Sequence, residues 1–204
     1  VEHIHCKECG SQAAEVIITA FSKLIPFYMC LKHGCTWHGL SKADESKIKL
    51  KIPRQEIPEQ DQKLRVMNYS EVPYGYTSEL AALEAGRCLQ CKSPRCVNGC
   101  PVNINIPEFV RLISEEQFDS AAKKIKERNI LPAICGRVCP QESQCEEICI
   151  LGERDKPVAI GNLERFVSDF ERRMELVKVP DIKIRLNKKI AVVGSGPAGL
   201  GAAF

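Results

Sequence analysis

The feature that most constrains this chain is a run of four cysteines that ends in a Cys-Pro step. The run has two, four and three residues between its cysteines, which are Cys88, Cys91, Cys96 and Cys100. A second group contains another Cys-Pro step and consists of Cys135, Cys139, Cys145 and Cys149. Closely spaced thiolates are typical ligands of iron–sulfur clusters, and eight thiols in two groups of four match the ligand count of two 4Fe-4S clusters.

An even count of twelve cysteines also permits a disulfide framework, as in secreted proteins. The sequence lacks the basic segment followed by an apolar segment that marks a signal peptide. The paired C-x2-C and C-x3-C spacings suit a metal centre better than long-range bridges. We therefore expect reduced cysteines in a cytoplasmic protein.

Bulk properties exclude two other classes of partner. No apolar stretch approaches the length of about 18 residues that a membrane-spanning helix needs, so we expect a soluble protein with no membrane partner. The formal net charge of +3 combines interspersed charges of both signs, and no basic face predicts nucleic-acid binding. The chain begins at Val1 and stops at Phe204 inside a motif, so we expect it to be a piece of a longer protein.

Residues 1–45 resemble a zinc ribbon. The segments Glu15–Phe21 and Ile25–Met29 are rich in β-branched and aromatic residues and predict a short hairpin. Three candidate zinc ligands flank it, at Cys6, Cys9 and Cys30.

Two residues are candidates for the fourth zinc ligand of this module. His33 keeps the usual two-residue gap after Cys30, whereas Cys35 offers the softer thiolate. A rubredoxin-like iron centre or a set of oxidisable thiols is the alternative to zinc. A module of this size has too little core to fold alone, so the metal would stabilise it directly.

Residues 46–74 carry several lysines and prolines without apolar periodicity, and we interpret them as a linker. Residues 75–180 predict a helical domain. Thr77 is a candidate N-cap for the helix that precedes Cys88, and Pro107 suits the first turn of the next helix. The expected buried faces are formed by Phe109, Leu112 and Ile113, and then by Phe118, Ala121, Ala122 and Ile125.

Asn162 is a candidate cap for a last helix whose core-facing residues would be Leu163, Phe166, Val167, Phe170 and Met174. The two pairs in the second cysteine group are each spaced four apart. On a helical turn this spacing either supplies two ligands to one cluster or lets the side chains diverge towards two clusters. Helices are therefore expected to hold the ligands.

The chain ends in K-K-I-A-V-V-G-S-G-P-A-G-L-G-A-A-F. Ile190–Val193 predicts a buried strand, and Gly194, Gly196 and Gly199 would allow a tight turn, approach of a pyrophosphate and close packing of the following helix. We interpret residues 187–204 as the truncated start of an α/β FAD-binding domain. Without parallel neighbours, residues beyond about 186 should be mobile or should borrow a pairing partner.

Four segments together resemble the small subunit of NADPH-dependent glutamate synthase. They are P-E-Q-D-Q-K-L-R-V-M-N-Y-S-E-V-P-Y-G-Y, the first cysteine run, L-P-A-I-C-G-R-V-C-P-Q-E-S-Q-C-E-E-I-C and P-V-A-I-G-N-L-E-R-F. The similarity runs from about Pro53 to Phe204 and extends to ferredoxin:NADP oxidoreductase large subunits and to the N-terminal part of dihydropyrimidine dehydrogenase. Residues 1–45 lie outside it.

The resemblance implies a helical domain with two 4Fe-4S clusters, followed by FAD and NADPH domains in an oligomeric enzyme. The clusters would carry electrons between the flavin and a partner redox subunit. It assigns one cluster to Cys88, Cys91, Cys96 and Cys149, and the other to Cys100, Cys135, Cys139 and Cys145. In bacterial ferredoxins the cysteine before proline also crosses to a second cluster, which supports this role for Cys100. The alternative is that each run closes on itself.

Four residues beside the cysteines are candidates for tuning a cluster potential, namely Gly99, Gly136, Arg95 and Arg137. The arginines could equally be plain surface charges. For the whole chain, the alternative to electron transfer is an interaction module in which metals only hold a scaffold together.

Overall fold

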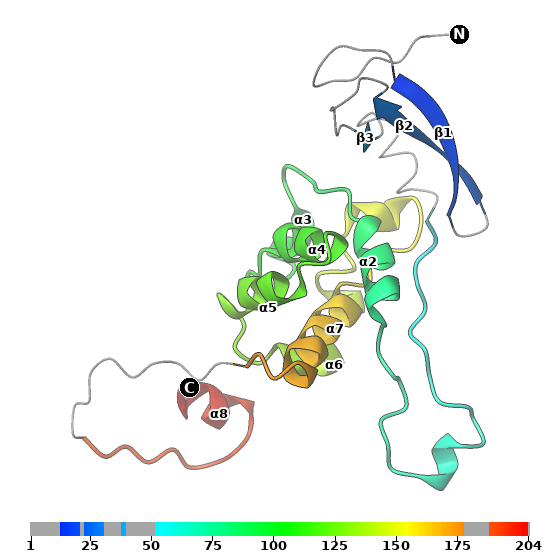
Figure 1. The fold of residues 1–204 in the computed structure, drawn as a ribbon. Coiled ribbons are helices and arrows are strands. Elements are labelled where there is room, and N and C mark those ends of the chain that lie inside the picture. The colour runs from blue at the N-terminus through cyan, green and yellow to red at the C-terminus, as the bar shows by residue number, and fades with distance from the viewer. Residues whose placement is uncertain (1–12, 21–22, 31–37, 40–51, 178–187, 204) are drawn as a thin grey trace. The chain divides into compact units, whose positions relative to one another are not determined.

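The computed structural model describes residues 13–20, 23–30, 38–39, 52–177 and 188–203. The chain divides into two compact units, Val1–Lys51 and Ile52–Phe204 (Figure 1). No helix in the described residues is long and apolar enough to cross a bilayer.

The first unit contains the predicted hairpin. Strands β1 (Ala13–Ala20) and β2 (Lys23–Cys30) pair antiparallel, and the short β3 (His38–Gly39) pairs with β2. The hairpin is confirmed, with strands that begin two residues earlier than predicted. Four candidate zinc ligands, Cys6, Cys9, His33 and Cys35, lie outside the described residues, so the zinc site stays a prediction.

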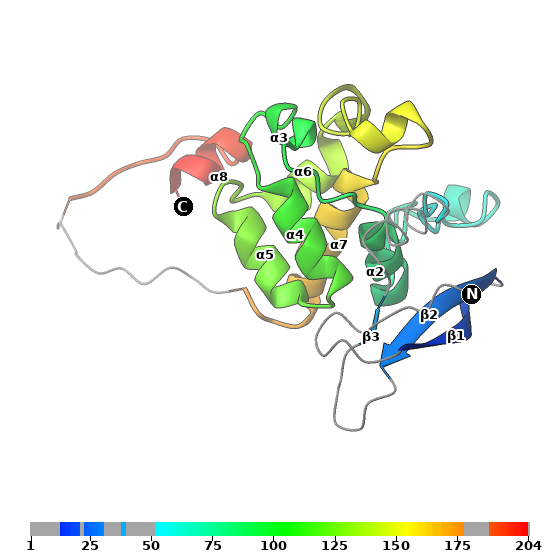
Figure 2. The same cartoon turned by 90° about the horizontal axis from the view of Figure 1, so that it is seen from above.

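The second unit is helical over residues 78–173, as predicted (Figure 2). Its α-helices are α2 (Ser78–Gly86), α3 (Arg95–Asn98), α4 (Ile106–Ser114), α5 (Phe118–Lys126), α6 (Pro132–Val138) and α7 (Ile160–Arg173). Short 3-10 turns are η1 (Arg65–Met67), η2 (Gln141–Ser143) and η3 (Ile150–Glu153). Helix α7 contacts α2, α4, α5 and α6, so it is the element on which the others assemble.

Local signals start two of these helices where the sequence predicts. The Thr77 hydroxyl accepts a hydrogen bond from the Leu80 amide at 3.3 Å, and Asn105 caps α4 in the same way with Pro107 in its first turn. Such caps satisfy backbone N–H groups that have no partner within the helix.

The core lies where α4, α5 and α7 meet. All seven residues predicted for the buried faces of α4 and α5 are buried. Phe118 packs edge-on against Phe166 and Phe170, with ring centroids 5.0 Å apart in each pair. Edge-to-face packing of this kind adds to the stabilisation from apolar burial.

Helix α7 departs from the prediction at both ends. It begins at Ile160, and Asn162 lies inside the first turn, where its amide donates to the Tyr76 hydroxyl at 3.3 Å. Distant carboxylates take over the capping role: Glu84 accepts from the Ala159 amide at 2.8 Å and Glu146 accepts from the Gly161 amide at 3.2 Å. Met174, predicted in the core, is exposed because the helix ends at Arg173.

The segment expected as a linker is part of the helical unit from Ile52 onward. Arg54 forms an ion pair with Glu146 at 2.7 Å, and the Gln55 amide donates to Glu84 at 2.7 Å. These contacts use backbone groups and single side chains, so they leave no periodic pattern in the sequence.

Residues 190–193 do not form the predicted strand. Ile190 and Val193 are 86% and 98% exposed. A strand needs a neighbour for its backbone hydrogen bonds, and the described residues offer none here. The helix expected after the glycines is present as α8 (Pro197–Ala203).

Candidate iron–sulfur centres

The eight cysteines of the helical unit are held mainly by turns and helix ends, which corrects the expectation that helices carry them. Only Cys96 in α3 and Cys135 in α6 lie within helices. Cys139 is the C-cap of α6 and Cys149 is the N-cap of η3. None of these eight cysteines forms a disulfide.

The structure brings four thiols from two distant segments to one cavity. It is lined by Cys88, Cys91 and Cys96 from the first run and by Cys149 from the second. Apolar side chains, among them Leu151 and Val158, complete its wall. Burial raises the pKa of Cys96 to about 12, and the negative fields of the other three thiolates add to the rise.

Effects on the pKa connect the other four thiols, Cys100, Cys135, Cys139 and Cys145. Burial raises the pKa of Cys145 to about 12, with further contributions from Glu146 and Cys100. Burial raises the pKa of Cys139 to about 11, followed by the effect of Cys135, and Cys100 contributes here too. Cys100 therefore lies in the electrostatic reach of the second cysteine run. Cys145 and Cys149, four apart, are joined by a turn rather than a helix, and Cys149 lines the first cavity.

Both groups have a donor set suited to a cluster. Within the described part of the chain, no three His, Cys, Asp or Glu side chains converge tightly enough to bind a single metal ion. A 4Fe-4S cluster takes four thiolates spread around a larger inorganic core, which four cysteines around one cavity can supply. The raised pKa values of Cys96, Cys139 and Cys145 mean that these three thiols ionise readily only when a cationic centre compensates their charge.

The two arginines near the cysteines differ in their surroundings. Arg95 lies on the wall of the first cavity and pairs with Glu153, and the field of Cys149 acts on it. Arg137 instead binds Glu71 at 2.7 Å and Asp169 at 2.8 Å. Its ion pairs connect α6 to the residues before α2 and to α7, which explains Arg137 without any role at sulfur.

The two glycines beside the cysteines allow close packing. A β-carbon on Gly136 would lie 2.6 Å from the Arg165 amide nitrogen in α7, and one on Gly99 would lie 2.8 Å from the Gln144 carbonyl oxygen. Neither distance leaves room for a side chain. Gly136 therefore lets α6 pack directly against α7, and Gly99 lets the end of α3 pack against Gln144.

Sequence reasoning missed a buried ion pair directly before Cys88. Arg87 and Glu84 have fully buried side chains and lie 2.7 Å apart. Arg87 also donates to three carbonyl oxygens, those of Ile52, Lys156 and Pro157. A buried charge requires this degree of pairing. No periodic signal announces it, because the partners come from three separate segments.

A second missed group lies beside Cys135. Its thiol is 3.6 Å from the Asn129 side-chain oxygen, and the Asn129 amide donates to Glu164 at 2.7 Å. Burial raises the pKa of Glu164 to about 7. This chain of contacts connects the second thiol group to α7.

The glycine motif at the chain's end forms a compact turn. Gly194 has a φ of +108°, which favours glycine, and a β-carbon on Gly199 would lie 2.2 Å from the Gly194 carbonyl oxygen. Gly196 precedes α8 and its carbonyl accepts from the Leu200 amide at 2.9 Å. FAD binding by this motif stays a prediction.

A family model described as dihydropyrimidine dehydrogenase domain II, 4Fe-4S cluster, matches residues 65–176, more than half of the chain. The chain belongs to this family. The match spans all eight cysteines of the helical unit, so the predicted family and its iron–sulfur character are confirmed.

Curated relatives of this 4Fe-4S family chain are oxidoreductase components. The chain is 36% identical to the glutamate synthase [NADPH] small chain of Escherichia coli over 74% of this chain and 32% of the relative. It is 43% identical to the NAD-dependent dihydropyrimidine dehydrogenase subunit PreT of the same organism over 66% of this chain and 33% of the relative. The putative oxidoreductase UacF is 38% identical over 68% and 22%. The chain thus spans about a third or less of the relatives it matches.

Proposed function

We propose that this chain is the electron-transfer region of a flavin-dependent, NADPH-linked oxidoreductase resembling the glutamate synthase small chain. Cys88, Cys91, Cys96 and Cys149 bind one 4Fe-4S cluster, and Cys100, Cys135, Cys139 and Cys145 bind the other. The single observation that carries this assignment is the cavity that joins Cys149 to the three thiols of the first run.

The clusters supply one-electron carriers, and the protein supplies their spacing and surroundings. Exchange of Cys149 and Cys100 between the runs ties the two clusters to one fold. Apolar walls at the first cavity exclude water, and the positive charge of Arg95 lies at its edge. Apolar surroundings disfavour the reduced, more negative state of a cluster, whereas a nearby positive charge favours it, and the balance of the two effects sets the potential.

Single cysteine-to-serine substitutions test the crossed assignment. We expect Cys100→Ser and Cys135→Ser to remove the same cluster, and Cys149→Ser to remove the cluster that Cys88→Ser removes. Electron paramagnetic resonance of the reduced, anaerobically reconstituted protein separates the two signals. If Cys100→Ser instead removes the cluster lost in Cys88→Ser, each run closes on itself and the assignment is wrong.

In the longer protein, FAD bound at a completed Gly194–Gly199 motif would receive a hydride from NADPH and pass single electrons to the clusters. A partner redox subunit or domain would accept them. A role of the ferredoxin:NADP oxidoreductase type is the second candidate within the family, because the sequence also resembles the large subunits of those enzymes. The 204-residue chain alone should be inactive.

A metal-held scaffold without electron transfer is the alternative from another class. Two clusters require about eight iron atoms and about eight sulfides per chain, with a visible band that dithionite bleaches. A colourless, iron-free protein prepared without oxygen would support the scaffold. A single zinc per chain, lost when Cys6 and Cys9 are replaced, would support the proposed zinc site in residues 1–45.

A further inference from the structure

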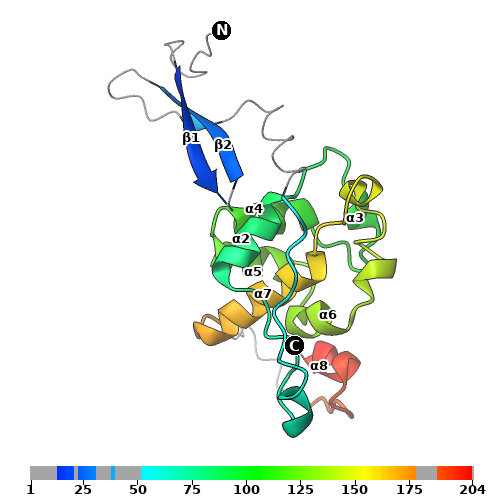
Figure 3. The same ribbon diagram turned by 90° about the vertical axis from the view of Figure 1, so that its right-hand side faces the viewer.

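An exposed arm of residues 61–71 projects from the helical unit (Figure 3). Its neck is closed by the backbone bridge between Glu59 and Pro73 and by a 2.9 Å hydrogen bond from the Gln60 amide to the Val72 carbonyl. Inside the arm, the side chains of Gln60 and Asn68 bind each other at 2.9 Å and also bind arm carbonyls. These hydrogen bonds therefore stabilise the conformation of the arm.

The arm carries apolar side chains that nothing within the described residues covers. Val66 is 75% exposed and Met67 is 82% exposed, while Leu64 and Tyr69 are also exposed. Lys63 and Arg65 alternate with them and have no ion-pair partner among the described residues. The arm also carries Asp61, whose carboxylate accepts from the Lys63 amide, and Glu71, which pairs with Arg137 and Arg165. Exposed apolar groups gathered in one place mark an interaction site, and Lys63 and Arg65 add two cations to it.

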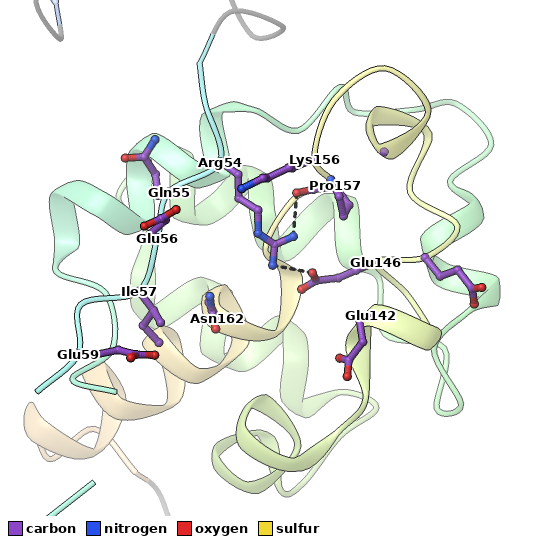
Figure 4. Close-up of a pocket in the computed structure, with 12 residues that line it drawn as sticks. Arg54, Gln55, Glu56, Ile57, Glu59, Glu142, Glu146, Lys156, Pro157 and Asn162 are labelled. Atoms are coloured by element: carbon purple, nitrogen blue, oxygen red, sulfur yellow. Dashed lines mark hydrogen bonds and ion pairs between the residues drawn. The ribbon is translucent and has the colours of Figure 1, made fainter. Parts of the chain in front are cut away.

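The same unit contains an open cavity of about 860 Å³ with the opposite charge (Figure 4). Arg54 and Glu146 pair across it at 2.7 Å and neutralise each other. The remaining charged wall consists of four glutamates and one lysine, namely Glu56, Glu59, Glu142, Glu147 and Lys156. None of these five has an ion-pair partner among the residues that the structure describes.

We propose that the arm of one chain docks into this cavity of a second copy, which returns its own arm. Lys63 and Arg65 complement the glutamates, and Ile57 and Pro157 on the cavity wall offer apolar contact to the arm. Glu59 belongs both to the cavity wall and to the arm's neck, so arm and cavity adjoin on one chain. A two-fold axis beside the neck then places each arm over its partner's cavity, as an isologous interface requires.

Charge reversal tests this dimer. We expect the reconstituted chain to sediment as a dimer, and Lys63→Glu with Arg65→Glu to raise the dissociation constant at least about tenfold, because like charges then meet. Glu56→Lys with Glu142→Lys should have the same effect. Combining all four substitutions in one chain should restore the dimer. A wild-type chain that stays monomeric, or four changes that do not restore association, would overturn the proposal.

The matched control is Arg128→Glu with Arg173→Glu, which reverses two exposed charges that belong neither to the arm nor to the cavity wall and should leave the dissociation constant unchanged. Iron content equal to wild type shows that each variant is folded. A monomeric chain that co-sediments with anionic phospholipid vesicles through the arm would assign the arm to a lipid surface, and would also overturn the dimer. These outcomes do not depend on electron transfer.

Discussion

At the scale of single residues, buried charges position the cysteines. Arg87, directly before Cys88, binds Glu84 and three carbonyl oxygens. These contacts fix the direction in which the chain leaves α2 at Cys88. Glu84 in turn accepts from the amides of Gln55 and Ala159. One pair of side chains thus joins α2, the start of α7 and the segment that begins at Ile52.

We expect Arg87→Met to lower the free energy of unfolding by about 3–5 kcal/mol, because it leaves the Glu84 carboxylate buried and unpaired. Denaturant unfolding of the reconstituted protein followed by circular dichroism measures this. Arg111→Met is the control: Arg111 pairs with Glu108 and Glu115 on the surface, where water screens the charges, and its loss should barely move the midpoint. Equal effects of the two substitutions would contradict the role of burial.

Glu164 should give the stability a measurable pH dependence. Burial raises the pKa of the folded carboxyl from its ordinary value near 4.5 to about 7. The folded state therefore holds a proton that the unfolded state releases, and the contribution of Glu164 to stability falls as pH rises from about 4.5 through 7.

Glu164→Gln removes this titration while keeping a hydrogen-bonding partner for Asn129. We expect the variant to gain stability relative to wild type as pH rises across that window, because other groups titrate alike in both proteins. Unfolding midpoints at pH 5, 6, 7 and 8 give the comparison. A constant difference across these values would mean that Glu164 does not change ionisation on unfolding.

At the scale of elements, α6 packs directly on the backbone of α7. The contact is at Gly136, whose missing side chain lets the helix that carries Cys135 lie against Arg165. Helix α7 thereby supports the helix that carries Cys135. The backbone amides at the start of α7 donate hydrogen bonds to Glu84 and Glu146. The position of α6, and hence of its cysteines, depends on α7.

Gly136→Ala should lower the free energy of unfolding by about 1–3 kcal/mol, the usual cost of overpacking, and should lower occupancy of the Cys135-bound cluster first. Iron content and the two paramagnetic signals report the occupancy. Gly86→Ala is the control, because no atom lies within 4 Å of the added β-carbon in α2. Preserved occupancy of both clusters in Gly136→Ala would show that α6 can shift without losing its ligands.

At the scale of the whole molecule, the chain is two compact units that meet between Lys51 and Ile52. All eight cysteines that we assign to clusters lie in the second unit. Its first residues take part in its packing, since Ile52 and Gln55 bind Arg87 and Glu84. The boundary therefore falls before the segment that composition marks as a linker.

A chain that starts at Ile52 should take up the same iron and sulfide as the 204-residue chain, whereas one that starts at Pro58 should take up less and unfold more easily. The shorter chain lacks the Arg54–Glu146 pair and the partners of Glu84 and Arg87. Metal analysis and thermal unfolding distinguish the two. Equal behaviour would place the boundary of the folded unit later than residue 57.

The sequence by itself determined the elements whose signals are local. The cysteine spacing indicated iron–sulfur chemistry, and Thr77, Pro107 and the apolar periodicity located α2, α4 and α5. Each of these signals lies within one or two turns of the residue it describes, so it can be recognised without knowing the fold.

Only the tertiary structure decided how these parts meet. It joined Cys149 to the first run, supplied Glu84 and Glu146 as caps for α7, and left Ile190–Val193 without a strand partner in the described part of the chain. The physical reason is the same in each case: the partner atoms come from residues far away in the sequence, and their arrival depends on the packing of the whole unit.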